Sequence, residues 1–298
     1  MHVSIVIRVK NEAEHLGSVL EAIGGQEQPC LEVIVVDSGS TDGTVQIAER
    51  FGARIIAIEP QSFTFGYALN VGVAVARGEV AAFLSGHAVP CHQRWLGSLT
   101  RPLLDEQVAG CYGRQVPLPD CHAWERVDME RYFGERPRVQ VDDPFFSNAN
   151  AAIRRDVWER IPFREDLSGS EDHAWASAAQ SAGYRIAYEP RAAVRHSHDE
   201  GLRQLYRRSA RERAGLLAAG LGDRYGSYSL VRCLAGSLRA ALRDSFALMR
   251  AGAGPGAVLG SPLRRLAQGL GGREAHRSYR RKAERFMSYS RKQQGTCP

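Results

Sequence analysis

Short apolar runs alternate with amphipathic stretches along the first 90 residues of the chain. The four apolar runs lie at residues 3–8, 31–36, 54–58 and 80–84. Runs of this length, bounded by glycine, proline or polar residues, are typical of strands buried on both faces of a parallel sheet. Between them, apolar residues at helical spacing predict helices over 13–23, 40–51 and 68–75, with Ser40 or Thr41 as the N-cap of the second helix. This alternation predicts a doubly wound nucleotide-binding sheet with right-handed crossovers.

The alternation is looser after Pro90. The pattern predicts strands at 108–116, 145–153 and from 185 onward, and helices at 95–104, 156–161 and 173–182. Gly183 follows the last of these helices and is expected to end it in the left-handed conformation. From Gly201 the pattern is helical and basic, with a flexible break predicted at 251–262 because of its glycines and prolines.

Charge divides the chain into two parts and predicts two domains, 1–198 and 199–298. The second part holds 20 Lys and Arg against 7 Asp and Glu, a net charge of +13, whereas the first part holds 19 against 26, a net charge of −7. A basic helical region attached to an acidic domain indicates an anionic partner. We expect an anionic membrane surface, since the sequence has no recognised nucleic-acid-binding motif.

Targeting signals are not evident in the sequence. No stretch approaches the roughly 18 apolar residues of a membrane span, and Arg8 and Lys10 interrupt the N-terminal apolar run too early for a signal peptide. The expected location is therefore the cytoplasm, with peripheral attachment to the inner face of the membrane through the basic region.

Polar residues follow two of the predicted strands at their carboxyl ends, where open α/β sheets bind ligands. The run at 80–84 ends at Ser85, Gly86 and His87, and the run at 31–36 ends at Asp37. Asp37 could accept hydrogen bonds from a nucleotide or could simply hold a turn. The first strand is not followed by G-x-G-x-x-G, which argues against a dinucleotide redox enzyme.

Four segments together resemble the inverting family 2 glycosyltransferases of the GT-A fold. They are SIVIRVKNEAEHL, EVIVVDSGSTDGT, ALNVGVAVARGEVAAFL and SEDHAWASAAQSAGYRIAY, and the resemblance covers roughly residues 2–198. It implies a Rossmann-like mixed sheet flanked by helices, with a basic, mostly helical C-terminal region. It also implies transfer of a sugar from a UDP- or dTDP-linked donor to a hydroxyl, on a lipid-linked or glycan acceptor, in cell-surface polysaccharide or glycolipid synthesis.

The chain departs from this family at the metal-binding Asp-x-Asp triplet, where it has Ser85-Gly86-His87. Three interpretations are open. His87 could bind a divalent metal with His196 or His198, and imidazole ligands would favour Mn²⁺ over Mg²⁺. The site could instead be metal-free, with His87 and Arg195 neutralising the diphosphate directly. Catalysis could also be lost.

The resemblance also assigns roles to other residues. Asp172 is the expected catalytic base, with Glu171 supporting it, because the start of a helix favours an ionised carboxylate. The residues expected to hold the nucleotide are Arg8, Glu12, Asp37, Asn70, Ser85 and Gly86. Asn148, Asn150 and Trp175 are candidates for contacts with the donor or acceptor sugar, although each could equally be structural.

Two other functions remain compatible with the sequence. The missing carboxylates of the triplet are compatible with a non-catalytic sugar-nucleotide-binding protein. A sugar nucleotidyltransferase would share the sheet, but it needs a Gly-rich loop bearing Arg and Lys near the N-terminus, and the sequence lacks one.

Overall fold

The computed structural model describes residues 1–118, 121–197, 200–222, 229–250 and 252–294, with side chains described as far as residue 281. The chain forms two compact units. One unit comprises Met1–Asp166 and Glu171–His198, and the other comprises Leu167–Ser170 and Asp199–Pro298.

The first four predicted strands are confirmed, and they are neighbours in one parallel block. Their order is β3-β2-β1-β4, and they comprise β1 (Val3–Val9), β2 (Glu32–Asp37), β3 (Arg54–Ala57) and β4 (Val80–Ser85). The register pairs Val9 with Asp37 and Arg8 with Ser85. The residues that end β1, β2 and β4 therefore lie along the same edge of the sheet.

Three helices connect these strands, α1 (Leu16–Gly24), α2 (Thr44–Arg50) and α3 (Phe65–Ala74). The predicted N-cap of α2 is wrong, because the helix begins at Thr44 and Gly43 precedes it. Ser40 does not cap the helix because its hydroxyl and backbone N–H bind the Asp37 carboxylate instead. The predicted start of the third helix is also late, since Thr64 caps α3 by accepting a hydrogen bond from the Tyr67 N–H.

The rest of the sheet is mixed, not parallel throughout. Strand β8 (Asn150–Arg154) pairs antiparallel with both β4 and β6 (Val108–Val116), and β9 (Arg185–Arg195) runs parallel to β6. The short strands β5 (Val89–Pro90) and β7 (Arg138–Gln140) both pair antiparallel with β9. The mixed sheet expected from the family resemblance is thus confirmed, whereas the doubly wound parallel pattern holds only for the first half.

The boundaries predicted for the second half are approximate. The strand predicted at 145–153 begins only at Asn150, and the helix predicted at 95–104 is α4 (Trp95–Thr100) followed by a 3-10 turn, Arg101–Leu104. The remaining helices of this unit are α5 (Ala123–Tyr132), α6 (Arg155–Arg160) and α7 (Glu171–Ser181). Gly183 has a φ of 91° after α7, as predicted for a left-handed helix end.

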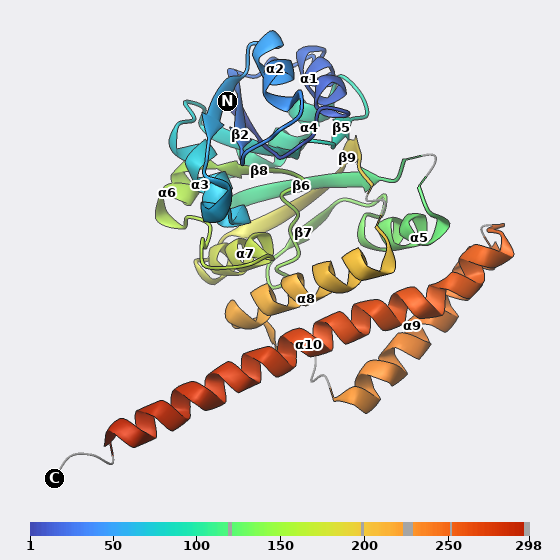
Figure 1. Ribbon diagram of the computed structural model, residues 1–298. Helices are drawn as coiled ribbons and strands as arrows, with labels where there is room; N and C mark the ends of the chain where they lie inside the picture. Colours follow the sequence, from blue (N-terminus) through green and yellow to red (C-terminus); the bar gives the residue numbers. More distant parts are fainter. Residues whose placement is uncertain (119–120, 198–199, 223–228, 251, 295–298) are drawn as a thin grey trace. The chain divides into compact units, whose positions relative to one another are not determined.

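Helices cover both faces of the sheet and create two hydrophobic cores (Figure 1). On one face, α1, α2 and α4 pack through Leu16, Ala48 and Trp95 against β1, β2 and β4. On the other face, α3, α6 and α7 pack on the same strands through Leu69, Val157 and other apolar residues. Because strands between two helical layers are buried on both sides, they are almost continuously apolar, and this is why the first half could be predicted.

The sugar-contact prediction is wrong for Trp175. Its side chain is 2% exposed and packs against Phe146 and Phe163, and its indole N–H donates to the Ile161 carbonyl at 2.8 Å. The ring is therefore part of the core beneath α7 and cannot be a platform for a sugar.

Asn150 is also structural, so its predicted sugar contact is wrong. The side chain is fully buried, and its amide donates to the Ala192 and Arg114 carbonyls at 2.7 and 3.1 Å and accepts from the Trp95 indole at 2.9 Å. These bonds join β8 to β6, to β9 and to α4. Gly113 lies directly beside this amide, where an added Cβ would approach Asn150 Nδ2 to 2.3 Å.

The described part of the second unit contains three long helices, α8 (Leu202–Ala218), α9 (Leu230–Arg250) and α10 (Pro255–Gln294), and α10 packs on both of the others. The predicted break at 251–262 is wrong beyond residue 254, since Pro255 starts α10 and Pro262 lies inside it. Pro262 has no N–H for the carbonyl four residues earlier. That carbonyl, of Val258, instead accepts a hydrogen bond from Ser245 Oγ of α9 at 3.4 Å.

The short segment Leu167–Ser170 belongs to the second unit, although it directly precedes α7. Ser168 Oγ donates to the Arg211 carbonyl at 3.3 Å, and Ser170 Oγ donates to the Glu212 carbonyl at 3.0 Å. Gly215 on α8 is required here, because an added Cβ would lie 1.8 Å from the Gly169 carbonyl oxygen. The segment is thus held closely against α8.

Membrane-spanning helices are absent from the described ranges, in which no helix is both long enough and apolar enough to cross a bilayer.

The structural role of Asn150 can be tested by replacing Asn150 with alanine. The change would leave the Trp95 indole N–H and two buried carbonyls unsatisfied, so we expect a loss of about 3 kcal/mol in the free energy of unfolding. Urea denaturation measures this loss. The exposed amide Gln61→Ala is the control and should change stability little; equal stability of the two variants would contradict the structural role.

Candidate active site

Asp37 ends β2 and organises the loop that follows it. Its carboxylate is 5% exposed and accepts hydrogen bonds from the N–H groups of Gly39 and Ser40, both at 3.1 Å. Gly39 has a φ of 85°, a left-handed conformation that glycine adopts without strain. These contacts show that Asp37 holds the turn, and its contact with a nucleotide remains a prediction.

The loops after β1 and β2 are joined to each other. Asn11 has a φ of 56°, and its side-chain oxygen accepts a hydrogen bond from the Thr41 N–H at 2.8 Å. The N–H of Glu12 donates to Thr44 Oγ1 at 2.8 Å. The two loops therefore form one ordered edge that fixes the position of Glu12.

The Ser85-Gly86-His87 segment lies beside Glu12. His87 Nδ1 is 2.9 Å from Glu12 Oε1, and the two side chains are 21% and 19% exposed. Gly86 is needed for this arrangement, because an added Cβ would approach Glu12 Cγ to 2.8 Å. The structure therefore brings together Glu12, Gly86 and His87 at the carboxyl end of β4, and their roles in binding remain predictions.

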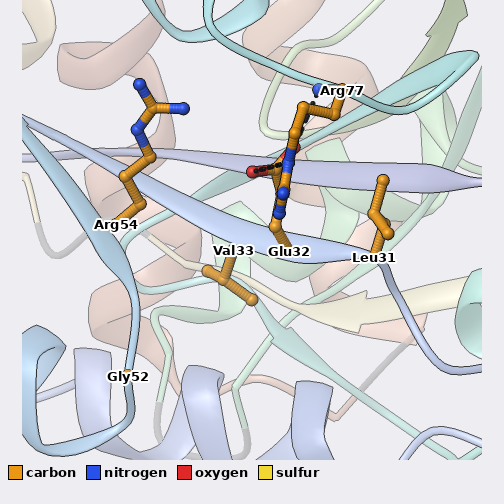
Figure 2. A pocket seen from close by; sticks show the side chains of 6 residues that line it. All are labelled: Leu31, Glu32, Val33, Gly52, Arg54 and Arg77. Atoms are coloured by element: carbon orange, nitrogen blue, oxygen red, sulfur yellow. Dashed lines mark hydrogen bonds and ion pairs between the residues drawn. The ribbon is translucent and has the colours of Figure 1, made fainter.

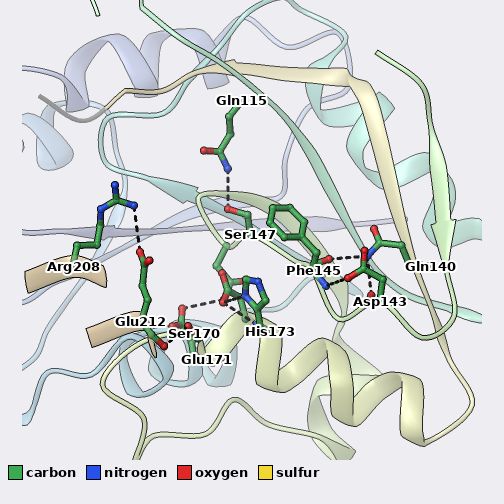
Figure 3. A network of polar contacts seen from close by, with 12 residues as sticks. Gln115, Gln140, Asp143, Phe145, Ser147, Ser170, Glu171, His173, Arg208 and Glu212 are labelled. Atoms are coloured by element: carbon green, nitrogen blue, oxygen red, sulfur yellow. Dashed lines mark hydrogen bonds and ion pairs between the residues drawn. The ribbon is translucent and has the colours of Figure 1, made fainter. Parts of the chain in front are cut away.

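His196 extends this cluster from the end of β9. It is 4% exposed, and its ring stacks on that of His87 with centroids 4.8 Å apart and planes at 11°. Its Nδ1 is 2.7 Å from Gln115 Oε1, and the Gln115 amide donates to Ser147 Oγ (Figure 3). In both histidines Nδ1 faces an oxygen acceptor, so the neutral ring would carry its proton on Nδ1.

Metal ligation was predicted for His87, His196 and His198. The side chains of the described residues include no group of three or more His, Cys, Asp or Glu placed to hold an ion. His198 lies outside the described residues. The tautomer of His87, with Nδ1 bonded to a carboxylate, is nevertheless the form in which metal-binding histidines are usually held.

Glu171 and Asp172 lie in the first turn of α7, which begins two residues earlier than predicted. Figure 3 shows Glu171 and His173 at the start of this helix. Glu171 is 5% exposed, and its Oε1 accepts from the Asn148 amide at 3.2 Å and lies 3.6 Å from Arg8 Nη1. The Arg8 guanidinium also lies over the Phe65 ring, 5.0 Å from its centroid. Arg8, at the end of β1, is thus linked directly to the predicted catalytic pair.

Two buried polar atoms beside Glu171 have no hydrogen-bond partner among the described residues. They are Arg8 Nη1 and Asn148 Oδ1. Buried polar atoms are nearly always hydrogen-bonded, so unsatisfied ones indicate a place where a polar ligand or water completes the site. Asn148 precedes β8 in an otherwise apolar stretch, which is the sequence signal that had marked it as a candidate.

The two carboxylates have different acidities. Burial raises the pKa of Glu171 to about 7, reinforced by the negative charge of Asp172 and opposed by Arg8. Burial also acts to raise the pKa of Asp172, but the charge and hydrogen bonds of His173, together with Arg8, outweigh it and hold that pKa below its ordinary value. At neutral pH Asp172 is therefore ionised and able to accept a proton.

Asn70 was predicted to bind the nucleotide, and its contacts argue against that role. Its amide donates to the Phe163 carbonyl and to Glu165 Oε1, both at 2.8 Å, and its oxygen accepts from the Trp158 indole and the Phe163 N–H. These four bonds use the whole hydrogen-bonding capacity of the side chain. Asn70 instead fixes the loop after α6 onto α3.

Three residues that shape this site were not predicted from the sequence, Phe65, Gln115 and His173. Gln115 is a polar residue near the end of a buried strand, a signal that could have identified it. Phe65 and His173 carry no comparable signal, since their contacts with Arg8 and Asp172 depend on the packing of α3 and α7.

An open hollow of about 420 Å³ lies elsewhere, at the amino ends of β2 and β3 (Figure 2). Within it, Glu32 pairs with the Arg77 side chain at 3.2 Å and accepts from the Arg77 N–H at 2.8 Å. Parallel strands carry ligand sites at their carboxyl ends, so this hollow is separate from the candidate active site.

The comparisons with known proteins agree with this architecture. The sequence model of Glycosyl transferase family 2 matches residues 4–161. The chain is 32% identical over 188 residues to O-antigen chain rhamnosyltransferase WbaN of Salmonella anatum, covering 59% of this chain and 60% of that protein. It is 30% identical over 220 residues to O-antigen chain rhamnosyltransferase RfbN of Salmonella typhimurium, covering 70% of each. The matches thus span about three fifths to seven tenths of these relatives.

A solved structure shares the fold. The mannosyltransferase PcManGT from Pyrobaculum calidifontis, in complex with GDP-Man and Mn²⁺, superimposes with a TM-score of 0.64 at 22% identity, covering 91% of this chain and 85% of that one. The mixed sheet with its flanking helices is accordingly a GT-A glycosyltransferase fold. The chain belongs to glycosyl transferase family 2.

Glu171 makes the stability of the protein depend on pH. Its pKa is raised in the folded state, so the stabilisation from its protonated form is present below the ordinary value of 4.5 and is lost as the pH rises to about 7. Glu171→Gln has no such titration. Between pH 4 and pH 8 we expect the wild type to lose roughly 3 kcal/mol of unfolding free energy relative to this variant.

Urea unfolding of both proteins across this pH range measures the difference. Glu21→Gln, an exposed change on α1, is the control and should follow the wild type at every pH. A difference between wild type and Glu171→Gln that does not change with pH would show that Glu171 is not the group that titrates.

Proposed function

We propose that the protein is an inverting glycosyltransferase that moves a sugar from a nucleotide sugar to a hydroxyl acceptor. The observation that carries this proposal is Asp172, an ionised carboxylate in the first turn of α7 beside the Arg8–Glu171 pair. The carboxylate accepts the proton of the acceptor hydroxyl, whose oxygen forms the new bond to the anomeric carbon. The bond to the nucleoside diphosphate breaks on the opposite face, and the diphosphate leaves with the electron pair.

The donor is proposed to lie along the carboxyl ends of β1, β2 and β4. In this proposal Asp37 orders the loop next to the nucleotide, and Ser85 and Gly86 lie near the diphosphate. Arg8 Nη1 and Asn148 Oδ1, the two buried atoms without a hydrogen-bond partner in the described residues, would bind polar groups of the sugar or diphosphate. A preorganised guanidinium also stabilises negative charge that develops on the leaving group.

A divalent metal is proposed to bind together with the donor. His87 would hold it, oriented by Glu12, with His196 and His198 as further candidates and diphosphate oxygens completing its ligands. Imidazole ligands favour Mn²⁺ over Mg²⁺. When bound, the ion would neutralise charge on the leaving diphosphate.

Cell-surface polysaccharide or glycolipid synthesis is the proposed setting. The two Salmonella relatives are O-antigen chain rhamnosyltransferases, so UDP- and dTDP-linked sugars, rhamnosyl donors among them, are the first donors to test. The acceptor is proposed to be lipid-linked or a glycan, reached at the inner face of the membrane. The net charge of +13 on residues 199–298 supports such a location.

Asp172→Asn tests the proposed base. An amide cannot accept the hydroxyl proton, so we expect transfer to fall by about a hundredfold to ten-thousandfold with little change in nucleotide affinity. Initial rates of transfer and calorimetric titration with the nucleoside diphosphate measure the two effects. Asp156→Asn, which changes an acidic residue in the first turn of α6, is the matched control. Near-normal transfer by Asp172→Asn would show that the base is another residue, whereas donor binding without turnover in the wild type would indicate a non-catalytic sugar-nucleotide-binding protein.

His87→Ala tests the proposed metal. Ligands that bind the folded state raise the unfolding temperature, so a donor heat-shift can be compared in Mn²⁺, in Mg²⁺ and in a chelator. We expect the largest shift in Mn²⁺, and we expect His87→Ala to lose the part of the shift that depends on metal. His92→Ala, a partly exposed histidine bonded to the Arg191 carbonyl, should keep it. An equal donor shift in chelator and in Mn²⁺ would contradict the proposed metal binding. It would not bear on the proposal that Asp172 is the base.

A further inference from the structure

Helix α9 exposes a continuous row of large apolar side chains. We call this row the apolar face of α9; its members are between 45% and 76% exposed, and they are Leu230, Val231, Leu234, Leu238, Leu242, Phe246 and Met249. Their spacing of three, four and seven residues places them on one side of the helix. Large exposed apolar patches on a protein indicate a surface that contacts a partner or a membrane.

Another side of α9 is already used to hold the helix in its unit. Cys233, Ala241 and Leu248 are buried there, and the buried Asp244 carboxylate pairs with Arg265 of α10. Ser237 Oγ also donates to the Arg265 carbonyl at 3.0 Å. Because α9 is anchored through this side, its apolar face is displayed by the folded protein and does not result from an unpacked helix.

A row of arginines borders the apolar face. Arg232, Arg239, Arg243 and Arg250 are exposed and lie on one further strip of α9, and the Arg250 guanidinium is 5.0 Å from the centroid of the Phe246 ring. The single acidic residue of the helix, Asp244, faces α10. The helix thus presents an apolar strip beside a cationic strip, with no exposed acidic residue on α9 between them.

We propose that this surface of α9 docks on an anionic lipid bilayer, with the apolar face among the acyl chains and the arginines against the headgroups. Amphipathic helices of this composition lie in the plane of the membrane interface, where apolar burial and attraction to anionic lipids both contribute. Charge complementarity favours this partner over a second copy of the chain, since pairing two such faces antiparallel around a two-fold axis would bring like-charged arginine rows together.

Docking through α9 would place the enzyme at the surface that carries a lipid-linked acceptor. This consequence rests on the proposed function, but the docking itself does not. Lipid binding can therefore be measured without any sugar donor, and nucleotide binding without any lipid, so failure of one proposal is distinguishable from failure of the other.

The test is sedimentation of the full chain with vesicles of phosphatidylcholine alone or of phosphatidylcholine with phosphatidylglycerol. We expect binding to the anionic vesicles, weakened by salt because screening shortens the range of the arginine charges. Replacing Arg232, Arg239 and Arg243 together with glutamine should lower this affinity by about a hundredfold. Replacing Leu238, Leu242 and Phe246 together with serine should lower it by at least about a hundredfold.

The controls separate docking from folding and self-association. All six side chains are exposed, so the unfolding temperature of both variants should match that of the wild type. A variant with Arg50→Gln and Leu104→Ser, exposed positions of the first unit, should bind the vesicles like the wild type. Equal binding to neutral and anionic vesicles would overturn the proposal, and so would unchanged binding by both α9 variants. It would also be overturned if the wild type bound no lipid but formed a dimer that the α9 variants do not form.

Discussion

Parallel pairing of β1 with β2 and with β4 is the constraint on which the candidate active site depends. The register that pairs Val9 with Asp37 and Arg8 with Ser85 brings the ends of three strands together. Each strand then turns into a loop whose polar groups are bonded to a neighbouring loop, as Asn11 is to Thr41. The candidate site is thus assembled from short polar segments that a buried sheet holds in place.

Burial of charge gives this edge its chemistry. Arg8, Glu171 and Asp172 are three ionisable groups that lie close together and are largely buried, so their charges affect one another strongly. His173 and Arg8 together favour the ionised form of Asp172, and burial raises the pKa of Glu171 to about 7. Two adjacent carboxylates thereby acquire different properties, which is the usual way in which one site provides both a ready base and a neighbour that can stay protonated.

Much of the fold could be predicted from the sequence, because strands between two helical layers are almost purely apolar. The first four strands and β6 were found close to their actual bounds for this reason. Helix starts were less predictable: Ser40 offers a hydroxyl suited to capping α2, but Asp37 binds it first. Pro262 belonged to a predicted flexible break, but it lies inside α10, where Ser245 of α9 donates a hydrogen bond to the Val258 carbonyl that Pro262 cannot reach with an N–H. In both cases a polar group finds a different hydrogen-bond partner from the one that the local sequence suggests, and that choice depends on tertiary packing.

The candidate site was predicted unevenly for a related reason. Asp37 and His87 could be recognised from position, because each follows a predicted strand at the edge where α/β sheets usually bind ligands, whereas Arg8 was identified only through the family resemblance. Asn70, Asn150 and Trp175 have residue types that often bind sugars, but the same hydrogen-bonding groups also satisfy buried carbonyls and indoles. Sequence cannot show which partner such a group finds, whereas the bond lengths and burial in the structure do.

The segment Leu167–Ser170 has a consequence for how the chain can be divided. It is covalently joined to Glu171, yet its own hydrogen bonds run to Arg211 and Glu212 of α8. The backbone that leads into the proposed base is therefore tethered by the basic helical region. A shortened protein that ends after β9 would keep every strand of the sheet, but the segment Leu167–Ser170 would lose its hydrogen-bond partners on α8.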